Sequence, residues 1–597
     1  MLTPNGSSGR NSARFGKADY ASLNRPFDSS ISHKVERAQN KRIYTAQIRL
    51  IYASAVFAAA FLAIALRLVD LTIFQESSEI DLRTSVSAPI TYGRSNITDR
   101  NGQILATSLS TASLYTNPKE ILDVDETATK LAQVLPDLNR QALKAKLSEP
   151  KSFIWIKRNL TPEQHYKVHM LGLPGLNFQR EERRVYPLGS MYSHVVGLTD
   201  LDSKGVSGIE KTFDGNLRKG GDDLQLSLDT RVQSILHEEL RRTVREFNAR
   251  GAAGLVLDAN TGEVIAMVSL PDFDPHEFSK SSQDARFNRI TLGVYEMGST
   301  FKIFNTAMAL DSGKVKISDS FDATHPIKIG RFEISDFHPE NRWLNVAEVF
   351  EHSSNIGSAK MALTAGINEQ KSFLQRLGLF NPATIELPEI GKPMLPRQWT
   401  EVTAMTVSYG YGISVTPLQL ARAVAGVVNG GVLPELTLLK RPANAPLPGV
   451  RVMSETTSKQ MRELLRLVVM KGTGQKADVG GYYVGGKTGT AEKSGAGGYA
   501  EKKLLSSFIG TFPTVDPKYV ILAMIDEPVA NKASFGFATG GWVAAPAVNR
   551  VIARMAPLLG YPPLDRKEDF MAKDRLVNNS PQNNANSLRK EAVYETQ

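Results

Sequence analysis

Glu296-Met-Gly-Ser-Thr-Phe-Lys302, continued by Ile303-Phe-Asn-Thr-Ala-Met-Ala-Leu310, is the stretch from which we interpret the whole chain. The run after the lysine is apolar on most sides, which is typical of a helix buried inside a large domain. Because residues three apart lie on one helix face, we expect Lys302 to project beside Ser299. A serine hydroxyl needs an adjacent base to become a good nucleophile, and a lysine with a lowered pKa can be that base. Ser299 and Lys302 are therefore the candidate nucleophile and base.

The Ser-x-x-Lys pattern is weak evidence when it stands alone. It also occurs at Ser148/Lys151, in a charged stretch that contains proline, and at Ser587/Lys590, in a polar tail. We interpret both as chance matches. The buried-helix context and two later motifs favour Ser299/Lys302.

The second motif is Ser353-Ser-Asn355. Between helices, such a loop places a hydroxyl and a carboxamide in a cleft, where they can relay a proton and bind a peptide amide. The alternative is an ordinary helix cap. Ser353 and Asn355 are kept as candidates because this motif lies in the chain between the Ser299-x-x-Lys302 motif and the third motif.

The third motif is Lys487-Thr488-Gly489-Thr490, which follows an apolar strand entry. The lysine adds positive charge, the threonine hydroxyls can bind a carboxylate, and the glycine lets a substrate backbone approach the strand. Lys493-Ser-Gly has a similar form but precedes a glycine-rich, loop-like stretch. We therefore prefer Lys487.

Length and composition bound the class of protein. A chain of 597 residues is too long for one core and predicts two or more domains. The net charge of +10 comes without a dense Lys/Arg run interleaved with aromatics, so we expect no nucleic-acid binding. The absence of cysteine excludes disulfides, thiol catalysis and Cys-ligated metals.

The first part of the chain predicts a membrane anchor. Residues 1–47 are polar with a basic excess, which predicts a disordered tail. Residues 50–66 carry no charge, and neighbouring apolar residues extend them to a spanning segment over 48–71. The basic flank precedes this segment, so we expect a cytoplasmic N-terminus and an exported remainder. A cleaved signal peptide is disfavoured by the long charged region before the apolar run, and a buried soluble helix is the other alternative.

The remaining chain predicts a multi-domain α+β protein. Residues 72–235 mix strand-like and helical patterns without a catalytic constellation, which indicates an elongated, non-catalytic pedestal or dimerisation-type domain. Residues 236–560 open with a strand–turn–strand signal at 251–269 and then alternate helices and strands. We expect helices packed on an antiparallel sheet there. Residues 561–597 are charged and then Asn-rich, which predicts a disordered tail.

The three motifs, in this order in one folded region, resemble the penicilloyl-serine transferases, which comprise penicillin-binding proteins and serine β-lactamases. Upstream, Arg94 to Ala106, Arg184-Val-Tyr-Pro187 and Gly208-Ile-Glu210 resemble class B penicillin-binding proteins, most of all their division-specific D,D-transpeptidases. The resemblance covers about residues 85–555. Ser95 and Met297 depart from the family pattern, which usually has glycine and proline there.

This resemblance implies a mechanism. The substrate would be a peptidoglycan stem peptide ending in D-Ala-D-Ala, which β-lactams mimic. Ser299 would attack with Lys302 as base, and the backbone N–H groups of Ser299 and Thr490 would form the oxyanion hole. Ser353, Asn355 and Lys487 would relay protons and bind the substrate. Thr488 and Thr490 would bind the terminal carboxylate. The resemblance implies no metal and no organic cofactor.

The resemblance also implies partners and leaves alternatives. It implies an inner-membrane protein of the bacterial cell that works with an FtsW-like glycosyltransferase and other divisome membrane proteins during septal wall synthesis. The alternatives are an elongation-specific class B transpeptidase, a membrane β-lactam sensor or a β-lactamase, and a non-catalytic divisome scaffold that keeps the fold.

Overall fold

The structure, a computed structural model, describes residues 48–49, 51–66, 93–330, 332–495 and 498–563. The chain divides into two units, residues 1–90 and 91–597. In the first, residues 51–66 form a helix with exposed side chains. No helix among the described residues is both long enough and apolar enough to span a membrane. The expected tail 1–47, residues 564–597 of the expected tail 561–597, positions 50 and 67–71 of the expected anchor, and residues 72–92 of the expected pedestal lie outside the described residues.

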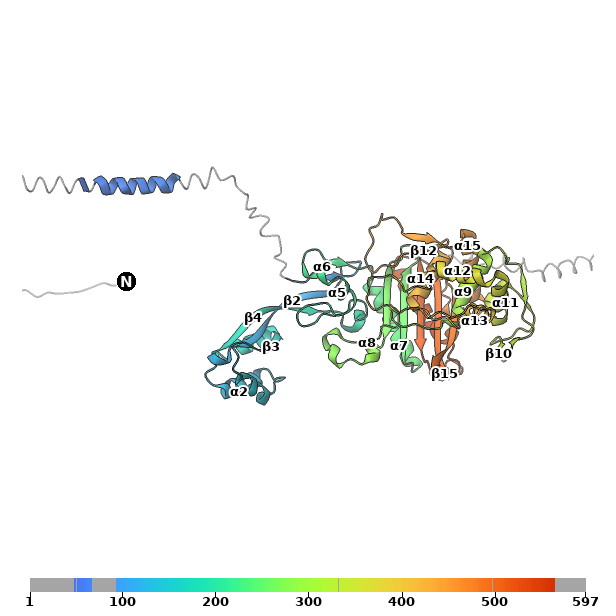
Figure 1. The fold of residues 1–597 in the computed structure, drawn as a ribbon, viewed down its shortest axis with the longest axis horizontal. Coiled ribbons are helices and arrows are strands. Elements are labelled where there is room, and N and C mark those ends of the chain that lie inside the picture. Colours follow the sequence, from blue (N-terminus) through green and yellow to red (C-terminus); the bar gives the residue numbers. More distant parts are fainter. Residues whose placement is uncertain (1–47, 50, 67–92, 331, 496–497, 564–597) are drawn as a thin grey trace, which may run out of the picture. The chain divides into compact units, whose positions relative to one another are not determined.

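The N-terminal part of the second unit is a mixed α+β structure on a five-stranded sheet. The sheet order is β3-β2-β1-β5, with β4 paired to the long strand β2 (Figure 1). A separate apolar core, which includes Leu114 of β2 and Leu131 of α2, joins the helices to this sheet. The elements are β1 Ile97–Thr98, β2 Ile104–Thr116, η2 Pro118–Glu120, α2 Val124–Val134, α3 Arg140–Leu147, β3 Ile154–Leu160, α4 Pro162–His169, β4 Leu176–Val185, η3 Gly189–Tyr192, α5 Gly208–Thr212, α6 Asp214–Arg218 and β5 Leu224–Gln225.

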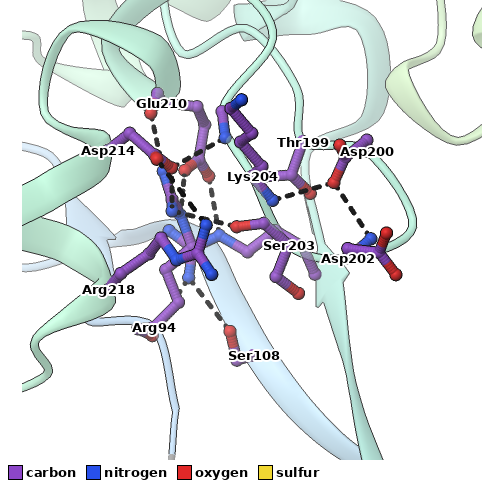
Figure 2. A network of polar contacts seen from close by, with 12 residues as sticks. Arg94, Ser108, Thr199, Asp200, Asp202, Ser203, Lys204, Glu210, Asp214 and Arg218 are labelled. Carbon is purple, nitrogen blue, oxygen red and sulfur yellow. Dashed lines mark hydrogen bonds and ion pairs between the residues drawn. The ribbon is translucent and has the colours of Figure 1, made fainter.

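A buried ion network ties this sheet to α5 and α6. The fully buried Glu210 accepts hydrogen bonds from Arg94 Nε at 2.5 Å and from Arg184 Nε at 2.6 Å. Arg94 also reaches Asp214 at 2.6 Å and the carbonyl of Ser203 at 3.0 Å (Figure 2). A carboxylate is tolerated in the interior when it is paired and hydrogen-bonded in this way. The motifs around Arg94, Arg184 and Glu210 therefore have a structural basis: they close one network.

Residues 230–563 are built on a five-stranded antiparallel sheet in the order β14-β15-β16-β6-β7 (Figure 1). The side chains of β6 alternate between its faces, as a strand requires. Ala252 and Val256 pack in the apolar cluster under α7 (Thr230–Glu246) and α16 (Gly540–Leu558). Leu255 and Leu257 pack in the opposite cluster with α9 (Lys302–Asp311) and α14 (Pro417–Val428). Helices therefore cover both faces of the sheet, in agreement with the α+β class predicted from the sequence. The five strands are β6 Gly251–Asp258, β7 Val264–Leu270, β14 Gly485–Gly495, β15 Gly498–Phe512 and β16 Tyr519–Asp526.

The remaining elements lie around this sheet. The helices are α7 Thr230–Glu246, η4 Pro275–Lys280, α8 Gln283–Arg286, η5 Gly298–Phe301, α9 Lys302–Asp311, α10 Val346–Glu351, α11 Asn355–Ala365, α12 Ile367–Arg376, α13 Glu401–Ser408, α14 Pro417–Val428, α15 Glu455–Met470, η6 Gln475–Ala477 and α16 Gly540–Leu558. The short strands are β8 Ser320–Asp322, β9 Ile327–Ile329, β10 Phe332–Ile334, β11 Trp343–Asn345, β12 Val432–Pro434 and β13 Gly449–Arg451.

The predicted boundary between residues 235 and 236 needs correction, because it cuts α7. This helix begins at Thr230 behind its cap Asp229, and it buries an apolar face against the sheet that carries β6 and β7. The chain reaches that sheet just before the helix, where Ser227 Oγ donates to the carbonyl of Val264 at 2.8 Å. The whole helix belongs to the larger domain.

Candidate active site

Ser299 and Lys302 are brought together by a tight turn. Gly298 to Phe301 form a 3₁₀ turn and α9 begins at Lys302. In 3₁₀ geometry, side chains three residues apart eclipse one another. Lys302 Nζ accordingly lies 3.0 Å from Ser299 Oγ. Gly298 has φ of +53°, and a Cβ there would meet the carbonyl oxygen of Thr490 at 2.7 Å, so this position requires glycine.

The surroundings of Lys302 direct its lone pair toward the serine. Lys302 Nζ lies 2.6 Å from the carbonyl of Ser353 and 2.7 Å from Asn355 Oδ1. Both oxygens can only accept hydrogen bonds. The Asn355 side chain is held in this orientation because its Nδ2 donates to the carbonyl of Ser335 at 2.9 Å. A neutral amine has two N–H groups and one lone pair. With both N–H groups given to these acceptors, the lone pair is left to accept a hydroxyl proton, and Ser299 Oγ at 3.0 Å and Ser353 Oγ at 3.1 Å are the two hydroxyls within reach.

The turn between α10 and α11 holds the second motif. Ser353 adopts φ of +60°, a conformation that non-glycine residues rarely take. Asp336, on the loop after β10, accepts from Ser354 Oγ at 2.7 Å, from Asn355 N at 2.5 Å and from Ile356 N at 3.0 Å. We did not identify Asp336 from the sequence, because no spacing rule links a residue after a short strand to this turn. The polar turn after β10 was the one available signal.

Lys487 enters the same cluster from β14, which is one of the two edge strands of the described sheet. Its side chain is fully buried, and its Nζ donates to Ser353 Oγ at 2.9 Å. Ser353 Oγ also lies 3.1 Å from Lys302 Nζ, so this hydroxyl stands between the two lysines. A continuous path of hydrogen-bonding groups therefore runs from Ser299 through Lys302 and Ser353 to Lys487.

The threonines of the third motif line the same strand. Thr488 Oγ1 lies 2.6 Å from Thr473 Oγ1, a residue to which we had assigned no role. Thr490 Oγ1 accepts from the backbone N–H of Gly540 at 3.1 Å. Gly489 lies between them, and a Cβ there would meet Ser507 Oγ at 2.4 Å. The strand thus presents two hydroxyls, separated by a position that has no room for a side chain.

Burial sets the charge state of the site. It is the main cause that lowers the pKa of Lys302 well below its ordinary value, and the positive charge of Lys487 adds to the effect while Asp336 opposes it. Burial also lowers the pKa of Lys487 to about 7. Ser299, Ser353 and Asn355 are only partly buried, whereas both lysines are fully buried. A neutral Lys302 beside an accessible hydroxyl is suited to activating a nucleophile.

The competing patterns do not join this cluster. Lys493 Nζ forms ion pairs with Asp526 at 2.8 Å and Glu527 at 2.7 Å. Lys151 pairs with Glu149 at 2.6 Å on an exposed surface. Ser587/Lys590 lies outside the described residues. The choice of Lys487 over Lys493 therefore agrees with the geometry.

An antiparallel sheet between helices, with a serine on the 3₁₀ turn before a central helix and a buried lysine at the first residue of that helix, defines a serine acyl-transfer enzyme of the penicilloyl-serine transferase type. Comparison with known proteins supports this class. Residues 252–553 match the penicillin binding protein transpeptidase domain, and residues 89–229 match the penicillin-binding protein dimerisation domain. The chain belongs to the penicillin-binding proteins, and this pair of domains is the class B arrangement.

Individual relatives cover most of the chain. It is 42% identical over 506 residues to the probable peptidoglycan D,D-transpeptidase FtsI of Caulobacter vibrioides, covering 82% of this chain and 84% of the relative. It is 30% identical over 520 residues to peptidoglycan D,D-transpeptidase FtsI of Escherichia coli K12, covering 81% and 87%. The fold is similar to that of penicillin-binding protein 3 from Mycobacterium tuberculosis in complex with aztreonam, with a TM-score of 0.62 and 23% identity over 79% of this chain and 98% of that one.

Proposed function

We propose that this protein is a peptidoglycan D,D-transpeptidase that cross-links stem peptides during septal wall synthesis through a serine acyl-enzyme, and that β-lactams inactivate it. The observation that carries the proposal is the path from Ser299 Oγ through Lys302 Nζ and Ser353 Oγ to Lys487 Nζ, with contacts of 3.0, 3.1 and 2.9 Å. The D,D-transpeptidase activity of the relatives named above supports the substrate.

Acylation uses the two lysines in different roles. Lys302 takes the Ser299 proton as Oγ bonds to the carbonyl carbon of the penultimate D-Ala, and the N–H groups of Ser299 and Thr490 stabilise the oxyanion. The C–N bond to the terminal D-Ala then breaks. Its nitrogen receives the proton from Lys302 through the Ser353 hydroxyl. Lys487 stabilises negative charge, and Thr488 with Thr490 binds the terminal carboxylate.

Deacylation runs the same relay in reverse. The amine of a neighbouring stem peptide attacks the ester carbon, loses a proton to Lys302, and forms the cross-link as Ser299 Oγ leaves and is protonated. A β-lactam enters as a mimic of D-Ala-D-Ala and forms the same ester. Its leaving nitrogen stays tethered in the opened ring, so the acceptor amine is kept out and the adduct persists.

The proposed organisation places the active site outside the cytoplasm. Residues 1–47 would be a cytoplasmic tail and 48–71 a single inner-membrane anchor, supported by the uncharged helix at 51–66. Residues 72–229 would be the pedestal and 230–560 the transpeptidase domain, followed by a tail. We propose an FtsW-like glycosyltransferase and other divisome membrane proteins as partners, and the similarity to the two FtsI relatives named above supports this.

Mass spectrometry after mixing with benzylpenicillin tests the chemistry. We expect one added drug mass that persists for many minutes and is lost in Ser299→Ala. Absence of an adduct in the wild type would favour a non-catalytic scaffold, and rapid release of penicilloic acid would favour a hydrolase.

Depletion of the protein in cells separates division from elongation. Filaments without septa support the division role, and rounded cells support the elongation alternative.

A further inference from the structure

A second polar contact joins α9 to α11 directly behind the catalytic one. Lys302 Nζ and Asn355 Oδ1, 2.7 Å apart, connect the first residues of the two helices. Three residues further along each helix, Asn305 Nδ2 donates to Ser358 Oγ and to the Ser358 carbonyl, both at 3.0 Å. Positions three apart lie on the same helix face. The same pair of helices is therefore held by two successive polar contacts.

This second contact extends to a third helix and is closed off from solvent. Ser358 Oγ donates to the carbonyl of Ser408 in α13 at 3.1 Å. Asn305 is 3% exposed and Ser358 is 1% exposed. The surrounding wall is mostly apolar, and Gln370 lines it together with Phe301, Phe304, Met308, Phe373, Leu374 and Val407.

Packing alone does not account for an asparagine at position 305. Its Oδ1 is buried and has no hydrogen-bond partner within the described part of the chain. A buried acceptor without a partner destabilises a fold, and a leucine of similar shape would fill the apolar wall without that cost. Local departures of this kind from optimal packing are expected where function requires them.

We propose that Asn305 and Ser358 are positioning residues for transpeptidation. Their contact sets the separation of α9 and α11, and thereby keeps Asn355 Oδ1 and the Ser353 carbonyl within bonding distance of Lys302. Neither residue touches the reacting atoms. The inference rests on the proposed function, because it assigns these residues to the acylation step.

The physical reason lies in the direction of the lysine lone pair. The two N–H groups of neutral Lys302 point at oxygens of α11 and of the turn before it, so the lone pair faces Ser299 only while α11 stays close to α9. If the helices separate, water enters and competes for both N–H groups. The same water reduces the desolvation that lowers the lysine pKa, while the charges of Lys487 and Asp336 facing Lys302 are unchanged.

The test compares Asn305→Leu with Met308→Leu in the full-length, detergent-solubilised protein. Met308 lies in the same apolar wall on the same helix, so its conservative substitution controls for repacking. The rate of acylation by fluorescent penicillin is measured from pH 6 to pH 10, together with the urea midpoint of unfolding. We expect Asn305→Leu to acylate about fivefold more slowly, which is about 1 kcal/mol, and Met308→Leu to stay close to wild type.

Four readouts separate positioning from simple destabilisation. The urea midpoint of Asn305→Leu should equal or exceed that of the wild type, while its acylation–pH midpoint moves upward. Ser358→Ala should add little to Asn305→Leu, because both remove one contact. The exchanged pair Asn305→Ser with Ser358→Asn should recover most of the lost rate. Recovery of the rate would be hard to explain by a structural role alone.

Several results would overturn the inference. They are an Asn305→Leu rate within twofold of wild type, an unchanged or lower pH midpoint, or a rate loss that follows a loss of folded protein. Additive losses in the double variant, or no recovery in the exchanged pair, would also count against it. Failure of the wild type to be acylated at Ser299 would instead refute the proposed function, so the two failures are distinguishable.

Discussion

Replacement of Lys487 by methionine should stabilise the protein while abolishing its activity. The side chain is fully buried, and burial lowers its pKa from the ordinary 10.5 to about 7. Between these two values, the unfolded chain binds more protons than the folded one, so the free energy of unfolding rises with pH in this window. Below pH 7 the lysine is charged in both states, and the folded state bears the full cost of burying that charge.

The magnitude follows from the two pKa values. The gap between 10.5 and about 7, at roughly 1.4 kcal/mol per pKa unit, is about 5 kcal/mol. Nearly all of this cost is present at pH 7, and only about 1 kcal/mol remains at pH 9.5. Loss of the contact to Ser353 Oγ costs about 1 kcal/mol at either pH. Lys487→Met should thus be about 3 kcal/mol more stable than wild type at pH 7, and about equally stable at pH 9.5.

Urea unfolding at pH 7 and pH 9.5, followed by tryptophan fluorescence, measures this difference. Lys493→Met is the matched control on the same strand, because Lys493 is partly exposed and paired with Asp526 and Glu527. The control should gain no stability at either pH. The reasoning is refuted if Lys487→Met is no more stable than wild type at pH 7, or if its advantage stays constant up to pH 9.5.

Three other predictions concern chemistry, backbone geometry and topology. Acylation by fluorescent penicillin should rise with pH through a midpoint well below the ordinary lysine pKa of 10.5, because the pKa of Lys302 is lowered, and Lys302→Arg should abolish labelling. Normal labelling of that variant would rule out the base role. Gly298→Ala should slow acylation at least tenfold, on the order of 1.4 kcal/mol, because its Cβ meets the Thr490 carbonyl at 2.7 Å. Gly313→Ala, with φ of +73° and nothing within 4 Å, should leave the rate close to wild type, and equal effects of the two would contradict the clash. Protease added to spheroplasts should remove the chain beyond about residue 75 and spare a small N-terminal fragment. Full protection of the large domain would contradict the topology.

Much of the fold and site was predictable because it depends on local patterns. The strand–turn–strand signal at 251–269 corresponds to β6 and β7. It could be recognised because a strand pattern and a turn each depend on consecutive residues. The contact between Ser299 and Lys302 follows from a spacing of three within one turn. The preference for Lys487 over Lys493 came from the loop-like residues after Lys493.

Other features depend on residues far apart in the chain, and only the tertiary structure could reveal them. Asp336 secures the Ser353–Asn355 turn from a separate loop, and the Asn305–Ser358 contact needs two helices packed at one separation. The pKa of Lys487 is a property of its burial, which no residue beside it in sequence determines. The sequence by itself determined which chemical groups are present and which neighbours share a turn or a strand. Packing decided which of them meet and which are cut off from water, because burial and long-range contact depend on the whole fold.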